Sequence, residues 1–109
     1  MEDIRARIEG EVSSWVGVDV HPHRFGGVEF LLGRRELGHL HGDRVADLPF
    51  TRRIRDMLIE TGRAEPHRFG VTGWVSHELD DDVVELFRLG YERARVAEAR
   101  RRAVNESAE

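Results

Sequence analysis

A β-hairpin is predicted by the stretch Val28-Glu-Phe-Leu-Leu-Gly-Arg-Arg-Glu-Leu-Gly-His-Leu-His41, which has two strand-like runs around Gly33-Arg34-Arg35. His39 and His41 are two residues apart on the second run. Since successive side chains of a strand point to opposite faces, both imidazoles point to the same face of the predicted sheet. The hairpin therefore decides the fold and also brings two titratable rings side by side.

The face that carries the two histidines depends on the length of the hairpin loop. A two-residue loop places them with the apolar residues of the first run, at the edge of the core: Val28, Phe30 and Leu32. A three-residue loop reverses this parity, so that Glu29 and Leu31 lie beside the histidines and Glu29 can pair with His39. The sequence leaves both registers open.

Hydrophobic periodicity and turn residues predict the other elements of the chain. Ile4, Ile8 and Val12 recur every four residues and indicate a first helix. Thr51 is a suitable N-cap for a second helix, and Asp80-Asp81-Asp82 places acids at the positive end of a third. The expected elements are helices over 2–14, 51–61 and 80–95, and strands over 16–20, 28–32, 36–41 and 73–79.

This order, α-β-β-β-α-β-α, predicts the α+β class. We expect a single small domain, mainly an antiparallel sheet of about four strands with helices packed on one face. The domain is expected to span residues 1–109, a length that suits one modest core. Residues 96–109 are expected to form a polar helical extension or a frayed tail, because the apolar stripe of the last helix fades beyond Arg95.

The composition excludes several classes of site and partner. The chain has no Cys, which rules out disulfides and thiol chemistry, and none of its 17 basic residues is Lys, which rules out a Schiff-base lysine. No apolar run approaches the ~20 residues that span a bilayer, and the acidic start does not resemble a signal peptide. The net charge of -4 argues against a general nucleic-acid binder. We expect a cytoplasmic monomer or homodimer with no membrane partner.

The pentapeptide Pro-His-Arg-Phe-Gly occurs twice, at residues 22–26 and 66–70, each time before a strand. One interpretation is structural: both loops use the same turn, and Phe25 and Phe69 fill the core. The other is functional: the basic residues of both copies converge on one pocket, in which an arginine clamps an anion and a histidine moves a proton. Those residues are His23, Arg24, His67 and Arg68.

Three interpretations of the His39-Leu-His41 strand compete. The rings are half-buried and bonded to carbonyls or carboxylates, or they wall a pocket as acid and base, or they bind a metal ion such as zinc or iron. A metal ion needs a third ligand, which Asp43, His67 or Glu29 can supply. The spacing alone does not choose among them.

Two other features have simple structural explanations. The arginines of residues 93–102 are accompanied by Glu92 and Glu98, which is typical of a solvated helix face, with phosphate contact as the alternative. Trp74, next to Gly73, suits a core position or the wall of a pocket.

Four segments of the chain resemble the luciferase-domain family, which includes fungal bioluminescence luciferases and short bacterial and archaeal proteins. They are Pro22-His-Arg-Phe-Gly-Gly-Val-Glu-Phe30, Arg35-Glu-Leu-Gly-His-Leu-His-Gly42, Asp47-Leu-Pro-Phe50 and the segment from Arg52 through Gly73-Trp-Val75. The resemblance covers about residues 12–95. It implies chemistry like that of the fungal enzymes, which oxygenate a hydroxypyrone without a metal or flavin. The positions that match are Arg24, Glu29, His39, His41, Asp43 and Trp74, and the family supplies no catalytic assignment for them.

The C-terminal half is also similar to the MmcQ/YjbR-like proteins, through Gly73-Trp-Val75 and a helix that ends Leu-Gly-Tyr-Glu-Arg-Ala94. This second resemblance implies a small α+β domain with an antiparallel sheet. It also implies a rival function in DNA binding.

We therefore expect a small-molecule site without metal or cofactor. If the protein is an enzyme, the compatible chemistry is removal of a proton from an enol or phenol by an imidazole, with Arg24 steadying the anion. The resemblance alone implies that oxygen then reacts with that substrate. The expected catalytic residues are His39, His41 and Glu29, and the expected substrate-binding residues are Arg24, His23, His67, Arg68, Trp74 and Asp43. The alternative is a non-enzymatic interaction module that binds an acidic partner or nucleic acid through Arg93 to Arg102.

Overall fold

The computed structural model describes residues 3–67, 70 and 72–107. Its helices are α1 (Ile4–Ser13), α2 (Arg52–Glu60) and α3 (Asp81–Ser107), and η1 (Arg24–Gly26) is a 3-10 turn. Its strands are β1 (Val18–His23), β2 (Gly27–Leu32), β3 (Arg35–His41), β4 (Val45–Pro49), β5 (Glu65–Pro66) and β6 (Trp74–Glu78).

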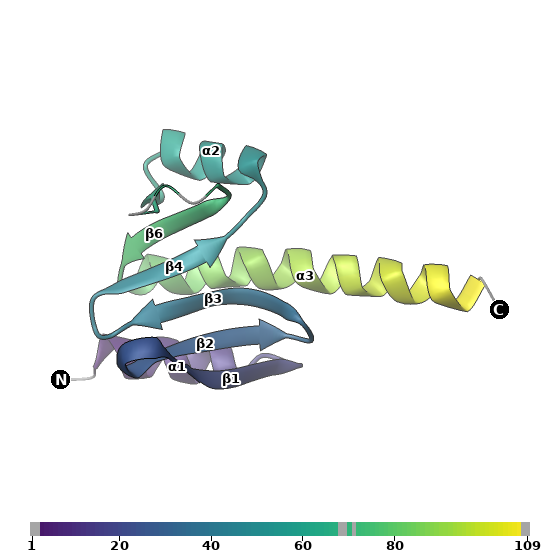
Figure 1. Cartoon of the computed structure of the whole chain (residues 1–109), viewed down its shortest axis with the longest axis horizontal. Coiled ribbons are helices and arrows are strands. Elements are labelled where there is room, and N and C mark those ends of the chain that lie inside the picture. Colours follow the sequence, from purple (N-terminus) through teal and green to yellow (C-terminus); the bar gives the residue numbers. More distant parts are fainter. Residues whose placement is uncertain (1–2, 68–69, 71, 108–109) are drawn as a thin grey trace.

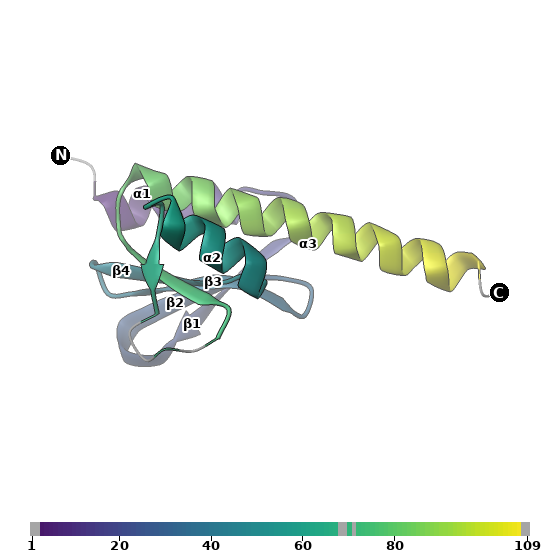
Figure 2. The same cartoon turned by 90° about the horizontal axis from the view of Figure 1, so that it is seen from above.

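The strands form one antiparallel sheet in the order β1-β2-β3-β4-β6-β5 (Figure 1). Figure 2, in which the sheet is seen from its edge, shows α1 and α3 together against one face. The α2 helix contacts β5 and β6 at the edge of the sheet. The opposite face of the sheet, which we call the outward face, is turned toward the viewer in Figure 1. This arrangement confirms the α+β class.

The core lies between the helices and the sheet. Phe30 on β2 and Phe87 on α3 are fully buried, and their rings meet edge to face with centroids 5.2 Å apart. Ile8 and Val12 bury the face of α1 that their four-residue spacing predicts. Tyr91 anchors α3 by donating its hydroxyl proton to the carbonyl of Val16 over 2.7 Å.

The sheet has more strands than expected. Two strands were not predicted: β5, which has only two residues, and β4, which ends in a proline and leads into the cap of α2. Their addition gives the order α-β-β-β-β-α-β-β-α. The first strand also differs, since β1 runs to His23 through residues that were expected to form a loop. Thr51 does cap α2, by accepting a hydrogen bond from the amide of Ile54 over 3.3 Å.

The last helix is longer than its apolar stripe. It continues to Ser107 and extends well past the end of the sheet (Figure 1). Val96 and Val104 on this part are exposed. Among the described residues, no helix has the length and apolar character that crossing a membrane requires.

The hairpin combines the two registers that the sequence left open. Its turn has two residues, because Leu32 pairs with Arg35, but Phe30 pairs with Gly38, so β3 has one extra residue. Leu37 is this β-bulge residue. Beyond the bulge, side chains point to the faces that a three-residue loop predicts, and Glu29 lies opposite His39. The bulge therefore turns Leu37 and Leu40 to the core while both histidines point to the outward face.

Candidate functional site

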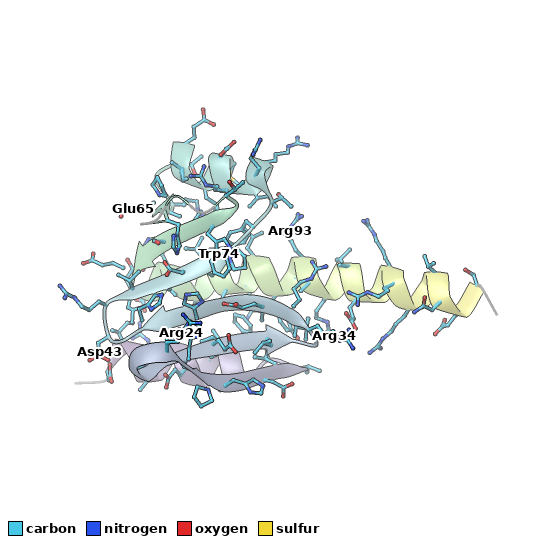
Figure 3. All side chains as sticks on the ribbon, viewed as in Figure 1. Arg24, Arg34, Asp43, Glu65, Trp74 and Arg93 are labelled. Carbon is cyan, nitrogen blue, oxygen red and sulfur yellow. The ribbon has the colours of Figure 1, made fainter. Side chains whose placement is uncertain are left out.

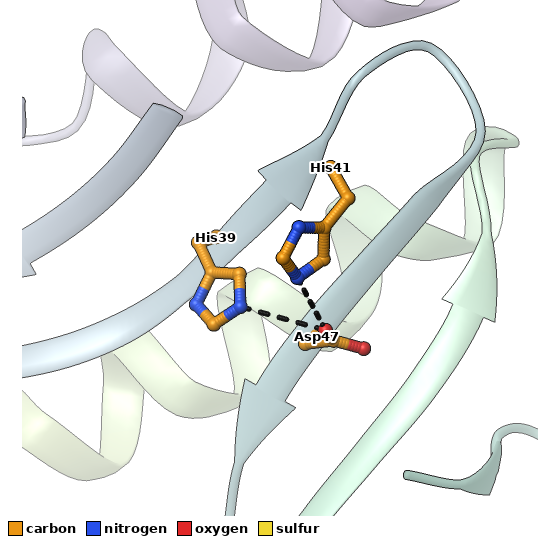
Figure 4. Close-up of side chains that lie close together, drawn as sticks. All are labelled: His39, His41 and Asp47. Carbon is orange, nitrogen blue, oxygen red and sulfur yellow. Dashed lines mark ion pairs between the residues drawn. The ribbon is translucent and has the colours of Figure 1, made fainter. Parts of the chain in front are cut away.

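Three histidines from two parts of the chain gather around one carboxylate on the outward face of the sheet. Asp47 on β4 is the centre of this group, and its side chain is only 7% exposed. One of its oxygens, Oδ2, lies 2.7 Å from Nε2 of His41 and 3.4 Å from Nε2 of both His39 and His67. Figure 4 shows the first two of these contacts. We call His39, His41, Asp47 and His67 the histidine–aspartate cluster.

The strand pairing explains why these side chains meet. His39 is directly opposite Asp47 in the β3–β4 ladder, and His41 is two residues further along the same face. Ser76 is opposite Asp47 on the other side, in β6, and donates its hydroxyl proton to Oδ1 over 2.5 Å. Asp47 is thus held from both neighbouring strands, with Oδ1 fixed by a hydroxyl and Oδ2 facing the imidazoles.

His39 has a carboxylate at each of its ring nitrogens. Its Nδ1 lies 2.7 Å from Glu36, three residues earlier on β3. Residues three apart on a regular strand point to opposite faces, so the bulge at Leu37 is what brings Glu36 and His39 together. Because an ionised carboxylate can only accept, the Nδ1 atom carries the proton in this hydrogen bond.

These contacts shift two pKa values in opposite directions. Burial opposes the charged imidazolium of His39, but its hydrogen bonds with Asp47 and Glu36 outweigh burial and raise its pKa to about 9. Burial likewise opposes the charged carboxylate of Asp47. Hydrogen bonds from His39 and Ser76, together with the charges of His67 and His41, lower the pKa of Asp47 to about 2. His39 and Asp47 therefore form an ion pair at neutral pH.

Aromatic rings extend the cluster across the outward face. His23 stacks on His39 with centroids 4.4 Å apart, and its Nδ1 lies 3.6 Å from Glu29. Trp74 lies on the other side, 5.4 Å from the ring of His39 and 6.1 Å from that of His67. The rings of His23 and Trp74 therefore both lie next to the ring of His39.

A cavity of about 730 Å³ opens beside the cluster, and His41, Asp47, His67 and Ser76 are in its lining. His41 has the most exposed ring of the cluster at 46%. A second cavity of about 430 Å³ is lined by Glu36 and Trp74, which both contact His39, and by Arg35 and Arg93. The cluster is thus accessible to a small molecule from the side of β4 and β6.

The expected site residues have different positions in the structure. His39, His41, Glu29, His23, His67 and Trp74 all lie at or beside the cluster. Arg24 is exposed in η1 and lies over the outward face (Figure 3). Asp43 lines the larger cavity but lies at the β3–β4 turn, where its exposed carboxylate is 3.8 Å from Arg5. Arg68, Phe69 and the side chain of Phe25 lie outside the described residues.

Three residues of the site were not predicted from the sequence. They are Asp47, which belongs to the cluster, and Ser76 and Glu36, which form hydrogen bonds with Asp47 and His39. Asp47 has a signal that was available. Asp47 stands between the apolar residues Ala46 and Leu48, and a tight turn at 42–44 would pair residue 47 with His39. Glu36 had no such signal, because its contact with His39 depends on the bulge.

Two groups of side chains in the described part of the chain have ligand atoms close enough to hold a metal ion. In the first, one atom each of His39, His41 and Asp47 lies within 4.8 Å of the others. The second is His77, Asp80 and Asp82, at the start of α3. In that group Asp80 already accepts the backbone N–H of Asp82, and the Nδ1 of His77 lies 2.6 Å from the carbonyl of Glu78. The third ligand was expected to be Asp43, His67 or Glu29. In the structure Asp47 also has a ligand atom close to those of His39 and His41.

The free energy of unfolding of chelator-treated protein is expected to decrease as the pH rises from 6.5 past 9. The pKa of His39 is raised from 6.5 to about 9 in the folded state, so its stabilisation is full below pH 6.5 and is lost as the pH passes 9. The size of the loss is on the order of 3 kcal/mol. For Asp47, whose pKa is lowered from 3.8 to about 2, stabilisation is present above pH 3.8 and is lost toward pH 2. The pKa shifts of His39 and Asp47 arise largely from the same ion pair, so its contribution to the free energy of unfolding is counted once.

Urea unfolding over a pH series measures this dependence. Glu36→Gln removes one of the two carboxylates that raise the pKa of His39, so the alkaline decrease should be smaller in this variant. His21→Ala, an exposed histidine on β1, serves as the control and should leave the profile unchanged. An identical alkaline profile in wild type and Glu36→Gln would contradict the assignment to His39.

Comparison with known proteins identifies the family of the chain. The luciferase-domain family model matches residues 34–89, which include β3, β4, α2, β6 and the first part of α3. No curated protein and no solved structure matches the chain. The matched segment holds every member of the histidine–aspartate cluster, and it covers half of the sequence. The chain belongs to the luciferase-domain family.

Proposed function

We propose that the outward face of the sheet binds a small acidic organic molecule, an enol or a phenol, as its anion, and that the protein is an oxygenase-like enzyme. One observation carries this proposal: three imidazole Nε2 atoms converge on a single buried carboxylate beside a cavity of about 730 Å³. Polar groups that converge in an accessible concave site are typical of small-molecule binding.

The groups around the cavity suit a planar anion. Imidazole N–H groups and the guanidinium of Arg24 are donors for an oxyanion. The rings of Trp74 and His23 offer flat surfaces on which a conjugated molecule can stack. A bound enolate or phenolate is richer in electrons than its neutral acid, and so reacts more readily with oxygen. Membership of the luciferase-domain family supports oxygenation as the reaction class.

The remaining expected residues belong to the same proposal. Glu29, paired with His23 on β2, is a carboxylate on this face that can accept the hydroxyl proton of the substrate. His67 and Ser76 line the cavity on the side of β5 and β6. Arg68 follows His67 in the chain and completes the proposed substrate-binding set.

A hydroxypyrone and its O-methyl ether, which cannot ionise at that oxygen, test the proposal directly. We expect the hydroxypyrone to bind to the wild-type protein and the ether to bind at least about tenfold more weakly, since a charged hydrogen bond is worth roughly 1.5–3 kcal/mol. His41→Ala should weaken binding of the hydroxypyrone by a similar factor. Isothermal titration calorimetry measures binding, and an oxygen electrode measures any turnover.

His21→Ala is the matched control, because His21 is exposed on β1 and is not part of the cluster. This variant should bind the hydroxypyrone as the wild type does. Equal binding of the hydroxypyrone and its ether, or equal binding by wild type and His41→Ala, would contradict an anion site at the cluster. Binding without oxygen uptake would retain the small-molecule site and remove the oxygenase class for this substrate.

The projecting part of α3 favours a second candidate, an interaction module. The C-terminal part of α3 extends beyond the sheet (Figure 1), and Arg100, Arg101 and Arg102 are exposed on this helix. If these arginines bind phosphates, DNA affinity should decrease steeply when the salt concentration is raised. A fluorescence-anisotropy titration with duplex DNA at low and physiological salt separates this function from the pocket, whose ligand affinity should change little.

A further inference from the structure

We infer that His39, His41 and Asp47 form a binding site for a divalent metal ion of the zinc–iron class. This inference goes beyond the proposed function, because the ion can be measured without any substrate. It also departs from the cofactor-free site that the sequence and the family resemblance predict. The argument rests on the spacing of the ligand atoms, on the groups that orient them and on the open side of the site.

The spacing of the ligand atoms suits a bound ion. Ligands about 2.0–2.1 Å from a tetrahedral zinc lie roughly 3.3 Å from one another, and neighbouring ligands in an octahedral site lie roughly 3.0 Å apart. Oδ2 of Asp47 is 3.4 Å from Nε2 of His39 and 2.7 Å from Nε2 of His41 (Figure 4). An ion between them therefore needs the His41 ring to move outward by a few tenths of an ångström, which its exposed position permits.

The ligand types are those of known metal chemistry. Two imidazoles and one carboxylate form the set used by catalytic zinc sites and by non-haem iron sites. The backbone fixes this set, since His39 and Asp47 are directly paired across β3 and β4 and His41 is on the same face of β3. A site on neighbouring strands of one sheet has little freedom to distort.

The surrounding hydrogen bonds orient the ligands toward the centre. Nδ1–H of His39 donates to Glu36, which leaves Nε2 as the nitrogen that faces Asp47. A carboxylate behind a histidine ligand is a recurring feature of metal sites, because it fixes the ring and makes it more basic. Ser76 plays the same part for Asp47 by holding Oδ1, so that Oδ2 is directed to the two rings.

The ion would replace a proton rather than an existing partner of the site. Nε2 of His39 faces Asp47 in the metal-free protein only as N–H, whereas a metal ion takes the deprotonated nitrogen. The positive charge between the two histidines and the carboxylate is thus kept when the proton leaves. The larger cavity beside His41 and Asp47 leaves one side of the site open for water or a ligand.

The second group of possible ligands provides an internal comparison. His77, Asp80 and Asp82 also have ligand atoms within 4.8 Å of one another, but the side chain of Asp80 is 49% exposed and caps α3. Its oxygen is already used by the amide of Asp82, and no carboxylate stands behind His77 in the hydrogen bonds of the described residues. His77→Ala is therefore a matched control for His41→Ala.

The test measures the metal content of protein that is purified without a metal-affinity tag and without chelator. We expect about one zinc or iron ion per chain in the wild type by plasma mass spectrometry. His41→Ala and Asp47→Asn should lose the ion, while His77→Ala and His21→Ala should keep it. Chelator-treated wild type should also take up cobalt(II), with a visible absorption band that His41→Ala lacks.

Glu36→Gln provides a second test if Asp47→Asn does not fold, which circular dichroism reveals. It keeps all three ligands but removes the carboxylate behind His39, and should weaken zinc binding by about 10–100-fold. The inference is overturned if wild-type protein holds no ion and takes up neither zinc nor cobalt. It is also overturned if His77→Ala loses the ion and His41→Ala keeps it. Metal uptake without hydroxypyrone binding would retain this site and reject the proposed function.

Discussion

Replacing Gly38 with alanine is expected to destabilise the protein by about 2–5 kcal/mol, through backbone strain and overpacking together. Gly38 has a φ of +150°, which residues with a side chain rarely adopt. A Cβ atom at this position would lie 2.8 Å from the backbone oxygen of Asp47 and 2.8 Å from Cε1 of Phe87. Neither is the mobile end of a flexible side chain, so the sheet or the core has to move.

The same substitution should impair the site on the other face of the sheet. Gly38 follows the bulge residue Leu37, and the bulge is what places Glu36 and His39 on one face. If the strand relieves the new contacts by losing the bulge, the register shifts by one residue and one of the two side chains turns away. We therefore expect weaker zinc and hydroxypyrone binding by Gly38→Ala, even at temperatures at which it is folded.

Urea unfolding measures the loss of stability, and Gly10→Ala is its control. Gly10 is within α1, and a Cβ atom there would meet nothing within 4 Å. This change should stabilise the protein by about 0.5–1 kcal/mol, because alanine loses less backbone entropy in a helix. The same substitution thus has opposite signs at the two sites. A Gly38→Ala variant as stable as the wild type would show that the strand accommodates a side chain without strain.

The bulge also marks the limit of what the sequence predicts here. Local patterns identified the hairpin, the helices and the cap at Thr51, because these features depend on residues within one or two turns of the chain. The register shifts at Leu37, and the next residue, Gly38, lies close to Phe87 on α3, a contact between distant segments that no local pattern contains. Both alternatives for the hairpin were therefore partly right, one at the turn and the other at the histidines.

The centre of the site was harder to predict than its histidines. His39 and His41 stand out because two imidazoles share one strand face, whereas Asp47 lies in the segment 45–49, which was not predicted to be a strand. Its importance follows from pairing with both β3 and β6, and β6 comes 27 residues after it in the chain. The two copies of the repeated pentapeptide likewise each bring a histidine to the cluster, His23 beside His39 and His67 beside Asp47. That meeting requires the strand order of the sheet, which no local sequence pattern contains.

Replacing Phe87 with alanine is expected to destabilise the protein by about 3–5 kcal/mol, the usual cost of removing a fully buried aromatic ring. Phe87 is 0% exposed and packs edge to face on Phe30, so the substitution leaves a cavity between α3 and the sheet. Gly38→Ala adds a side chain to the sheet itself, whereas Phe87→Ala removes one from α3, on the face of the sheet that the helices cover. The histidine–aspartate cluster lies on the outward face and should keep its affinity for zinc and hydroxypyrone in the folded protein.

The double variant Gly38→Ala/Phe87→Ala tests whether the two effects share a cause. Removal of the ring relieves one of the two closest contacts of a Cβ atom at residue 38, but leaves the backbone oxygen of Asp47 and the positive φ. The loss of stability should therefore be smaller than the sum of the single losses, by about 0.5–3 kcal/mol for residues in direct contact. Binding to the cluster should still be impaired, because the contact with Asp47 and the strained backbone remain. A strictly additive loss would mean that the strand yields toward Asp47 and that α3 does not hold the bulge in place.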